Sequence, residues 1–371
     1  MLVPGRVLVV GNYPDDEQES MLRFGAMLVD NLRAIGVEVD YVQPRPVFGR
    51  RAGTSPRLRK LAGYLDKFVI FPVVLWFVAR RYRVVHITDH SNALYVEFAG
   101  ARKTLVTCHD LFAVRGMLGD LDAARGGVSG RILQRWILRG LRRAARFTAV
   151  SDVTAHDLAR LVAEPRVTMI PNALADAFVV SASAGAPAEP AGVPYFLHIG
   201  GNQFYKNRAG VVRLFNHLTQ TAEFAGHRLV MAGKPPIGDF AGELAQSPVH
   251  DRIDVLITPD DATVHALYKG AQALLFISLT EGFGWPVIEA QALGCPVVTS
   301  DREPMRSVAG GAAVLVDPED PVSATAAIVA ARDIWPRLRL RGLANARRYY
   351  PAEIYPQYPA IYREIAGAYC P

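Results

Sequence analysis

The sequence predicts an α/β protein with two doubly wound domains, each built around a parallel sheet. Short apolar runs of strand length, such as RVLVVG (6–11) and LLFIS (274–278), alternate with longer amphipathic helical patterns in both halves of the chain. A segment rich in small residues and proline, SASAGAPAEPAGVP (181–194), separates the halves and is typical of a linker. The 371 residues therefore divide into expected domains at 1–180 and 195–349, with a C-terminal helix over 350–371.

The composition is that of a globular protein, with half of the residues apolar and a fifth charged. Its three cysteines (Cys108, Cys295 and Cys370) are widely spaced and form no disulfide or metal pattern, which predicts a reducing, cytoplasmic compartment. The N-terminus enters a strand at once, so no signal peptide is expected.

The formal charge of +6 comes largely from arginine clusters in 45–60 and 131–146. No nucleic-acid recognition motif accompanies them, so nucleic acid is not expected as a partner. An anionic membrane surface or a phosphorylated acceptor fits the charge, and solvated basic helix faces fit it equally well. The apolar run Phe68–Ala79 contains Pro72 and is too short to span a bilayer; we expect a buried helix, with an interfacial amphipathic segment as the alternative.

The first half reads as a strand at 6–10, a helix at 21–35 and a strand at 37–42, followed by strands that begin at 84, 104, 146 and 167. Ligands of such sheets bind beyond the carboxyl ends of the strands. Candidates there are Ser20 at the first helix start, Asp89 and His90 after the third strand, and the pair His109–Asp110 after the fourth. The spacing H-x-x-D-H (86–90) on a strand end would not aim three ligands at one metal ion. A capping aspartate beside a partly buried histidine is the alternative for His109–Asp110.

The second half opens with the strand YFLHIGG (195–201), and Lys206 follows beside a predicted helix that Asn207 could cap. A cation beside a positively polarised helix start suits a diphosphate. Strands follow at HRLVMAG (227–233), RIDVLI (252–257) and AAVLV (312–316), and the tail from 332 to 369 is helical in pattern.

The stretch Ser278–Asp301, SLTEGFGWPVIEAQALGCPVVTSD, carries the strongest signal. It predicts a strand end, a glycine turn, a helix with Pro286 in its first turn and Gly294 at its end, and the next strand. Gly282 and Gly284 allow close approach of backbone N–H groups to an anion. Glu281 and Glu289 bracket the turn with seven residues between them, so each could accept hydrogen bonds from one hydroxylated ring of a ligand with a central diphosphate. A dinucleotide fingerprint fits worse, because Val287 stands where its third glycine would be.

EGFGWPVIEAQALGCPVVTSD resembles the glutamate–seven–glutamate signature of retaining glycosyltransferases of family 4, which have the GT-B fold. The His109–Asp110 pair, the VS (150–151) and PN (171–172) landmarks and the Lys206 loop resemble the same family. The resemblance implies two Rossmann-like domains facing a central cleft, with the last helix crossing back onto the first domain. Three departures stand out: Glu19 and Ser20 replace a glycine pair, Gly201 replaces a loop arginine, and Ser307 replaces a glutamate.

The resemblance also implies roles. Glu281 would hold the sugar hydroxyls, Glu289 the ribose, and His109 would border the sugar. Lys206 and the amides of Gly282, Phe283 and Gly284 would bind the diphosphate. The remaining donor contacts would come from the phosphate loop and the base-side loop: Gly201, Asn202, Asn207, Ile257 and Thr258. Ser20, Asp89, His90 and Asp110 would face the acceptor.

The expected function is transfer of a hexose, with retention, from a UDP- or GDP-linked sugar to an acceptor hydroxyl in bacterial-type cell-surface glycan or glycolipid assembly. No cofactor or metal is expected. The partners would be the nucleotide sugar, a glycan or lipid-linked acceptor, and an anionic membrane contacted through Arg45–Lys60 and Phe68–Ala79 on its cytoplasmic face. A sugar-nucleotide epimerase and a non-catalytic binding subunit of the same fold are the alternatives. An oxidoreductase fits least, since neither half has a Gly-x-Gly-x-x-Gly turn after its first strand.

Overall fold

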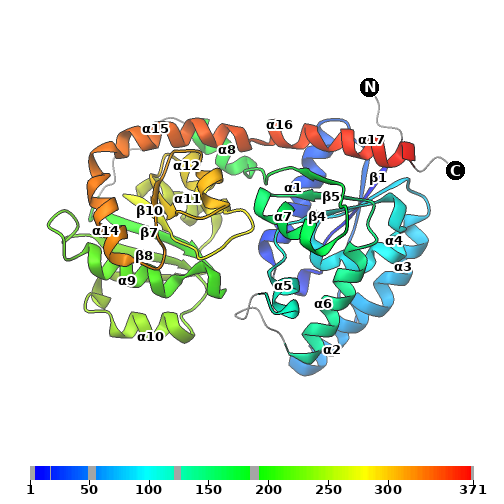
Figure 1. Ribbon diagram of the computed structural model, residues 1–371, viewed down its shortest axis with the longest axis horizontal. Coiled ribbons are helices and arrows are strands. Elements are labelled where there is room, and N and C mark those ends of the chain that lie inside the picture. Colours follow the sequence, from blue (N-terminus) through cyan, green and yellow to red (C-terminus); the bar gives the residue numbers. More distant parts are fainter. Residues whose placement is uncertain (1–4, 17, 49–55, 121–126, 184–191, 369–371) are drawn as a thin grey trace. The chain divides into compact units, whose positions relative to one another are not determined.

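A computed structural model describes residues 5–16, 18–48, 56–120, 127–183 and 192–368 of the chain. By contacts the chain forms two compact units (Figure 1). The first comprises Met1–Asn172 together with Ala352–Pro371, and the second comprises Ala173–Pro351. The predicted α/β class is confirmed in both units.

The first unit is built on a parallel six-stranded sheet in the order β2-β1-β3-β4-β5-β6. Residues Val7–Val10 of the first strand pair in register with Val39–Val42 on one side and Val84–Ile87 on the other. The central strands are buried on both faces, as a parallel sheet covered by helices requires. The strands are β1 (Val7–Val10), β2 (Val39–Val42), β3 (Val84–Ile87), β4 (Thr104–Cys108), β5 (Arg146–Ala149) and β6 (Val167–Met169).

Helices cover this sheet (Figure 1). The main ones are α1 (Glu19–Ala34), α2 (Pro56–Leu65), α3 (Phe71–Ala79), α4 (Val96–Ala99), α5 (Phe112–Leu118), α6 (Val128–Leu141), α7 (Asp152–Leu161) and α17 (Tyr358–Ala368). A π-helical turn, Asp66–Ile70, joins α2 to α3, so Pro56–Ala79 is one helical segment. Ser151 caps α7 by accepting a hydrogen bond from the Thr154 N–H.

The C-terminal helix α17 is tied to the first sheet by buried polar contacts. His86 on β3 lies 2.8 Å from the Tyr362 hydroxyl through Nδ1 and 2.7 Å from the Thr107 hydroxyl through Nε2. The Thr107 hydroxyl is in turn 2.7 Å from that of Thr148 on β5. These contacts fix the tail to three neighbouring strands, although it follows the whole second unit in sequence.

The second unit has a parallel six-stranded sheet in the order β12-β11-β10-β7-β8-β9. Its strands are β7 (Tyr195–Gly200), β8 (Arg228–Gly233), β9 (Ile253–Ile257), β10 (Ala273–Phe276), β11 (Val297–Ser300) and β12 (Val314–Val316). Its helices are α8 (Asp176–Ser183), α9 (Arg208–Leu218), α10 (Gly238–Gln246), α11 (Asp261–Gly270), α12 (Trp285–Ala292), α13 (Met305–Ala309), α14 (Pro321–Ala330), α15 (Trp335–Ala346) and α16 (Pro351–Ile354). Helices α9, α10 and α14 pack together, and α11, α12 and α15 form a second group (Figure 1).

The structure differs from the sequence-based picture at two places. The contact boundary falls before Ala173 rather than within 181–194, because α8 packs against α12 in the second unit. Residues 184–191 of the expected linker lie outside the described residues. The expectation of a buried helix at Phe68–Ala79 is wrong for its outer face: Phe71, Leu75 and Ala79 are buried, whereas Val73 and Phe77 are exposed.

Candidate functional site

The central turn of the second unit follows the carboxyl end of β10. Gly284 has φ 106°, a left-handed conformation that favours glycine, and it precedes the first residue of α12. Pro286 lies in the first turn of α12, and Gly294 follows its end with φ 70°. Gly282, Phe283 and Gly284 are all buried, and the Phe283 ring packs against that of Tyr349. The predicted strand–turn–helix–strand unit is confirmed.

Lys206 and Glu281 form an ion pair at this turn. The Lys206 Nζ lies 2.8 Å from Oε1 and 3.0 Å from Oε2 of Glu281, and both side chains are largely buried. A backbone hydrogen bond of 2.8 Å from the Leu279 N–H to the Tyr205 carbonyl joins the two loops. An ammonium group has three N–H donors, and among the described residues two of those of Lys206 are directed at Glu281. The third donor is not directed at Glu281, and the ammonium also lies 5.2 Å from the centre of the Phe276 ring.

Glu289 lies on the buried face of α12, about one helical turn after the glycine turn. Its Oε2 accepts a hydrogen bond of 3.0 Å from the hydroxyl of Tyr268, which is itself fully buried on α11. The two glutamates are thus held differently, Glu281 by a cation and Glu289 by a phenol. This fixes the orientation of both carboxylates before any ligand binds.

Asn207 is the N-cap residue of α9, with φ 52°, but its side chain does not cap the helix. The predicted side-chain cap is therefore wrong. Its Nδ2 donates instead to the carbonyls of Ile277 and Pro318, at 3.0 Å each. Asn207 thereby holds the start of α9 to the strands beside it, which fixes where Lys206 stands.

Asn202 and Gly201 lie in the loop after β7. The Asn202 Nδ2 donates to the Pro235 carbonyl, and its Oδ1 accepts a 2.6 Å hydrogen bond from Arg208. At Gly201 a β-carbon would lie 2.5 Å from the Gln203 side chain, so the loop is closely packed there. Asn202 thus joins the loop after β7 to the loop after β8 and to the start of α9.

Ile257 is the last residue of β9, and Thr258 follows it at the start of the next loop. The Thr258 N–H already donates to the Gly233 carbonyl at 2.8 Å, and Thr258 has φ 47°. Ile257 is exposed. The Thr258 amide, which is predicted to contact the nucleotide base, is therefore already used in a hydrogen bond within the protein.

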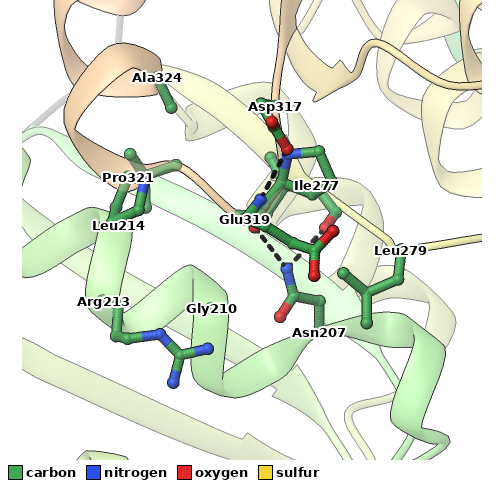
Figure 2. Close-up of a pocket in the computed structure, with 11 residues that line it drawn as sticks. Asn207, Gly210, Arg213, Leu214, Ile277, Leu279, Asp317, Glu319, Pro321 and Ala324 are labelled. Atoms are coloured by element: carbon green, nitrogen blue, oxygen red, sulfur yellow. Dashed lines mark hydrogen bonds between the residues drawn. The ribbon is translucent and has the colours of Figure 1, made fainter.

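A pocket of about 240 Å³ opens beside the start of α9 (Figure 2). Asn207 projects into it, with Asp317 and Glu319 from the loop after β12 and Arg213 from α9 around it. Glu281, Glu289 and Lys206 do not line this pocket. Its volume is below the range of about 300–1,000 Å³ usual for ligand pockets, and we do not assign the donor site to it.

In the first unit, polar side chains gather where β1 and β3 end. The Asn12 Nδ2 donates to Oδ2 of Asp89 at 2.8 Å and to the Gln18 side chain at 2.7 Å. His90 Nδ1 lies 3.0 Å from Asp89 Oδ1. Burial opposes charge on both groups, but each charged partner outweighs it, so the pKa of His90 is raised and that of Asp89 is lowered. The two residues form a buried pair at this strand end, which is an ion pair when His90 is protonated.

His109 and Asp110 follow β4. His109 Nε2 lies 3.1 Å from the Thr88 carbonyl, which can only accept, so Nε2 carries the proton. Burial lowers the pKa of His109, which keeps the ring neutral near pH 7. Phe24 on α1 packs edge-on against this ring at 4.5 Å. Asp110 accepts a hydrogen bond from the Phe112 N–H, as a capping aspartate would.

Ser20 is exposed in the first turn of α1, as the sequence predicts. The neighbouring Met21 N–H donates to the Gln18 carbonyl, so it is not directed at a ligand. In the described part of the chain, no three His, Cys, Asp or Glu side chains lie close enough to hold a metal ion. His86 of the H-x-x-D-H pattern is turned toward Tyr362, away from Asp89 and His90.

Sequence reasoning missed Tyr268 and His198, and it offered Arg208 only as a substitute for the loop arginine that Gly201 replaces. Arg208 is buried, lies 3.9 Å from the Phe240 ring and donates to Asn202 and to the Lys234 carbonyl; burial lowers its pKa to about 10. His198 Nδ1 donates to the Leu275 carbonyl, and burial lowers its pKa to about 4. The signal for His198 in the sequence was its place in the predicted strand YFLHIGG (195–201). The partners of Tyr268 and Arg208 come from distant segments.

Two family models match the chain in succession. Residues 23–177 match "Glycosyltransferase Family 4", and residues 182–338 match "Glycosyl transferases group 1". The O-antigen chain mannosyltransferase B of Escherichia coli is 26% identical over 231 residues, which span 59% of this chain and 60% of that protein. An O-antigen chain mannosyltransferase of Salmonella typhimurium is 30% identical over 138 residues, or 36% of this chain and 37% of that protein.

Among solved structures, the sucrose-phosphate synthase of Thermosynechococcus elongatus superposes with a TM-score of 0.73. The alignment covers 98% of this chain and all of that one at 18% identity, so it bears on the fold alone. Together with the two successive family models, it shows that the chain belongs to the family 4 glycosyltransferases and has the GT-B fold.

Proposed function

We propose that this protein transfers a hexosyl group, with retention of anomeric configuration, from a UDP- or GDP-linked sugar to an acceptor hydroxyl in bacterial cell-surface glycan assembly. The names of the two relatives favour mannose as the sugar. The observation that carries the proposal is the buried Lys206–Glu281 pair at the glycine turn, with the Tyr268-held Glu289 behind it.

The difficult step is departure of the nucleoside diphosphate, because negative charge grows on its oxygens as the bond to the sugar breaks. Lys206 keeps one N–H donor for these oxygens, and its position is set by Glu281. A charge fixed in a largely buried site stabilises the transition state without reorganising. Gly282, Phe283 and Gly284 add backbone dipoles at the start of α12. Glu281 also holds sugar hydroxyls, and Glu289 accepts from the ribose.

Retention follows from attack on the face that the leaving group vacates. The bond from C1 to the diphosphate oxygen breaks, the bond from C1 to the acceptor oxygen forms, and the acceptor proton passes to the departing oxygen. No protein nucleophile is consumed in this scheme. Because Lys206 and the backbone dipoles neutralise the leaving group, we expect turnover without a divalent metal or other cofactor.

We assign the acceptor side to the first unit. His109 is neutral and buried, and we place it beside the sugar; Asp110, the Asp89–His90 pair and Ser20 would contact the acceptor. The acceptor would be a glycan or lipid-linked precursor on the cytoplasmic face of a membrane, reached through the basic stretch Arg45–Lys60 and the helix Phe68–Ala79. Residues 49–55 of that stretch lie outside the described residues.

The test is release of nucleoside diphosphate from GDP-mannose, UDP-glucose and UDP-galactose, with bacterial polyprenyl-diphosphate-linked glycans as acceptors and EDTA present. We expect one donor to give glycosylated acceptor and nucleoside diphosphate in equal amounts. The anomeric configuration of the new bond, measured by NMR, should match that of the donor. Binding of a nucleotide sugar with no release for any acceptor would support a non-catalytic subunit. Release without an acceptor, together with an altered free sugar, would support an epimerase.

A further inference from the structure

The helical segment Pro56–Ala79, here called the arm, carries a continuous apolar outer face. Leu61 is 66% exposed, Val69 55% and Phe77 58%. Exposed apolar residues continue along the same segment at every turn: Leu58, Leu65, Val73, Val74 and Trp76. Soluble monomers rarely leave so long a run of large apolar side chains in water, so this face is expected to be covered by a partner.

The inner face of the arm is built into the first unit. Phe71, Leu75 and Ala79 are buried in its core, and so is Asp66. In an unbroken α-helix, Asp66 and Phe71 would point about 140° apart. The π-helical turn at Asp66–Ile70 changes this register, so that both side chains face inward.

Leu58–Ala79 is 22 residues long, enough to cross a bilayer by length and composition alone, with 28% of its most apolar window buried. Because its inner face belongs to the core of the unit, the arm can meet lipid only along its outer face. This is the geometry of an interfacial helix rather than of a spanning one.

Helix α6 extends the apolar face. Its Trp136 ring packs on Phe68 of the arm, with ring centroids 5.9 Å apart, so the two helices lie side by side (Figure 1). Val128 and Ile132, one turn apart at the start of α6, are exposed. Two helices together present a broader surface than one amphipathic helix.

Basic residues surround this surface. From Pro56 to Arg83 the sequence has seven basic residues and a single acidic one, the buried Asp66, and α6 has three arginines and no acidic residue. The exposed ones that flank the arm and α6 are Arg59, Lys60, Arg80, Arg81, Arg83, Arg131 and Arg135. The Arg80 guanidinium also lies 3.3 Å from the centre of the Trp76 ring. Apolar side chains bordered by cations match the acyl chains and anionic headgroups of a bilayer.

The arm is also joined to the loop after β1. Buried Asp66 accepts a hydrogen bond from the hydroxyl of Tyr13, which lies in that loop. It also accepts one from the Phe48 N–H in the segment after β2. Lys67 pairs with Asp16 at 2.7 Å. The same loop carries Asn12, which donates to Asp89 on the acceptor side. A protein docked through the arm would therefore hold its acceptor residues at the lipid surface.

We propose that the outer face of the arm, with the start of α6, docks on an anionic lipid bilayer and presents the loop after β1 to a lipid-linked acceptor. The part concerning the acceptor rests on the proposed function, whereas the docking itself does not. The occupant is a bilayer rather than a second copy of the chain, because the cations flanking this face would face one another in a symmetric pair.

The test is flotation of the full-length protein with phosphatidylglycerol vesicles and with phosphatidylcholine vesicles. A triple variant, Leu61→Asp, Val69→Asp and Val73→Asp, changes the arm face. Its matched control, Ile237→Asp, Val322→Asp and Leu340→Asp, changes three equally exposed apolar residues of the second unit, at 60%, 63% and 70%. A second triple variant, Arg59→Gln, Arg80→Gln and Arg131→Gln, tests how much the flanking cations contribute to vesicle binding.

We expect the wild type and the control to float with anionic vesicles and the arm variant to lose at least tenfold in binding. The arginine variant should weaken binding, and 0.5 M salt should weaken binding of the wild type. Brominated acyl chains should quench the fluorescence of Trp76, and the Trp76→Phe protein should lose this quenching while still floating.

Equal flotation of the arm variant and the control would overturn the proposal, and so would a wild-type dimer that the arm variant dissociates. Nucleotide binding in solution is measured on the same proteins. It separates the docking proposal from the proposed transferase function, and it shows whether each variant is folded. Lost flotation with intact nucleotide binding supports docking. Flotation without nucleotide binding would contradict the transferase function and leave docking standing.

Discussion

At the scale of single residues, the donor side depends on how two buried carboxylates are held. Glu281 has Lys206 as its counter-ion, so neither charge is buried alone. Glu289 has the Tyr268 hydroxyl as a donor. Each contact joins residues from separate segments. We expect loss of the Lys206 contact to affect turnover and loss of the Tyr268 contact to affect donor binding.

Removing the Lys206 cation should impair the chemical step. Lys206→Ala should lower kcat by about 10²–10³-fold, as loss of a preorganised charge at a leaving group does. It should also destabilise the protein by about 3 kcal/mol, because the Glu281 carboxylate stays buried without its partner. Adding Glu281→Gln should restore the free energy of unfolding but not kcat. Steady-state kinetics and urea unfolding of the three proteins check this, and a double variant that regains activity would contradict the assignment.

Removing the Tyr268 hydroxyl should affect donor binding. Tyr268→Phe removes the hydrogen bond that the phenol donates to Glu289, so KM for the nucleotide sugar should rise several-fold while kcat changes little. The loss of one buried hydrogen bond should cost about 1 kcal/mol of stability. An unchanged KM would show that Glu289 does not contact the donor.

The sequence anticipates Glu281, Glu289 and Lys206 because each lies next to a glycine turn or a helix start with a recognisable local pattern. It does not anticipate Tyr268, because its partner Glu289 lies 21 residues away and no local spacing connects the two. Asn207 shows a different failure. Its position as N-cap is local and correct, but its side chain is used for carbonyls of Ile277 and Pro318, which only the folded sheet brings near.

At the scale of elements, strands are well predicted because both sheets are parallel and buried, so each strand is an uninterrupted apolar run. The orientation of the arm is poorly predicted, because FPVVLWFVA (71–79) is apolar on every side. It has no periodicity that would separate an inner from an outer face. The π-helical turn has no sequence signature at all. Its effect is visible only in the five-residue step between buried Asp66 and Phe71.

The attachment of α17 to β3 should make the first unit sensitive to acid. Burial lowers the pKa of His86 to about 3, so the folded protein keeps this ring neutral, whereas the unfolded chain takes up a proton below about pH 6.5. The contribution of the neutral His86 ring to the free energy of unfolding is therefore fully present above pH 6.5. It is lost as the pH falls toward 3, by roughly 3 kcal/mol at pH 4.

Thermal unfolding of the wild type and of His86→Gln between pH 4 and 8 checks this. The variant should lose stability at pH 7 and show a shallower pH dependence. The matched control is His156→Gln, at an exposed histidine of α7 in the same unit, which should follow the wild type. Parallel pH profiles for His86→Gln and the wild type would show that His86 does not cause the acid sensitivity.

At the scale of the whole molecule, the chain combines two doubly wound units, and the polypeptide returns to the first after completing the second. The donor candidates belong to the second unit and the acceptor candidates to the first. The apolar arm belongs to the first unit as well, so the proposed lipid surface and the proposed acceptor residues lie in one compact unit. A transferase that uses a water-soluble donor and a lipid-linked acceptor is expected to divide its surfaces in this way.

The most direct test of the central claim is a thermal-shift panel of UDP, GDP, ADP and dTDP, each with EDTA and with magnesium. The proteins compared are the wild type, Lys206→Ala, Glu289→Gln and the control Arg337→Ala, which removes an exposed cation of α15 in the same unit. One diphosphate should raise the melting temperature of the wild type and the control equally with and without magnesium, and neither site variant should respond. No shift with any nucleotide, or a shift that persists in both site variants, would contradict the donor site described above.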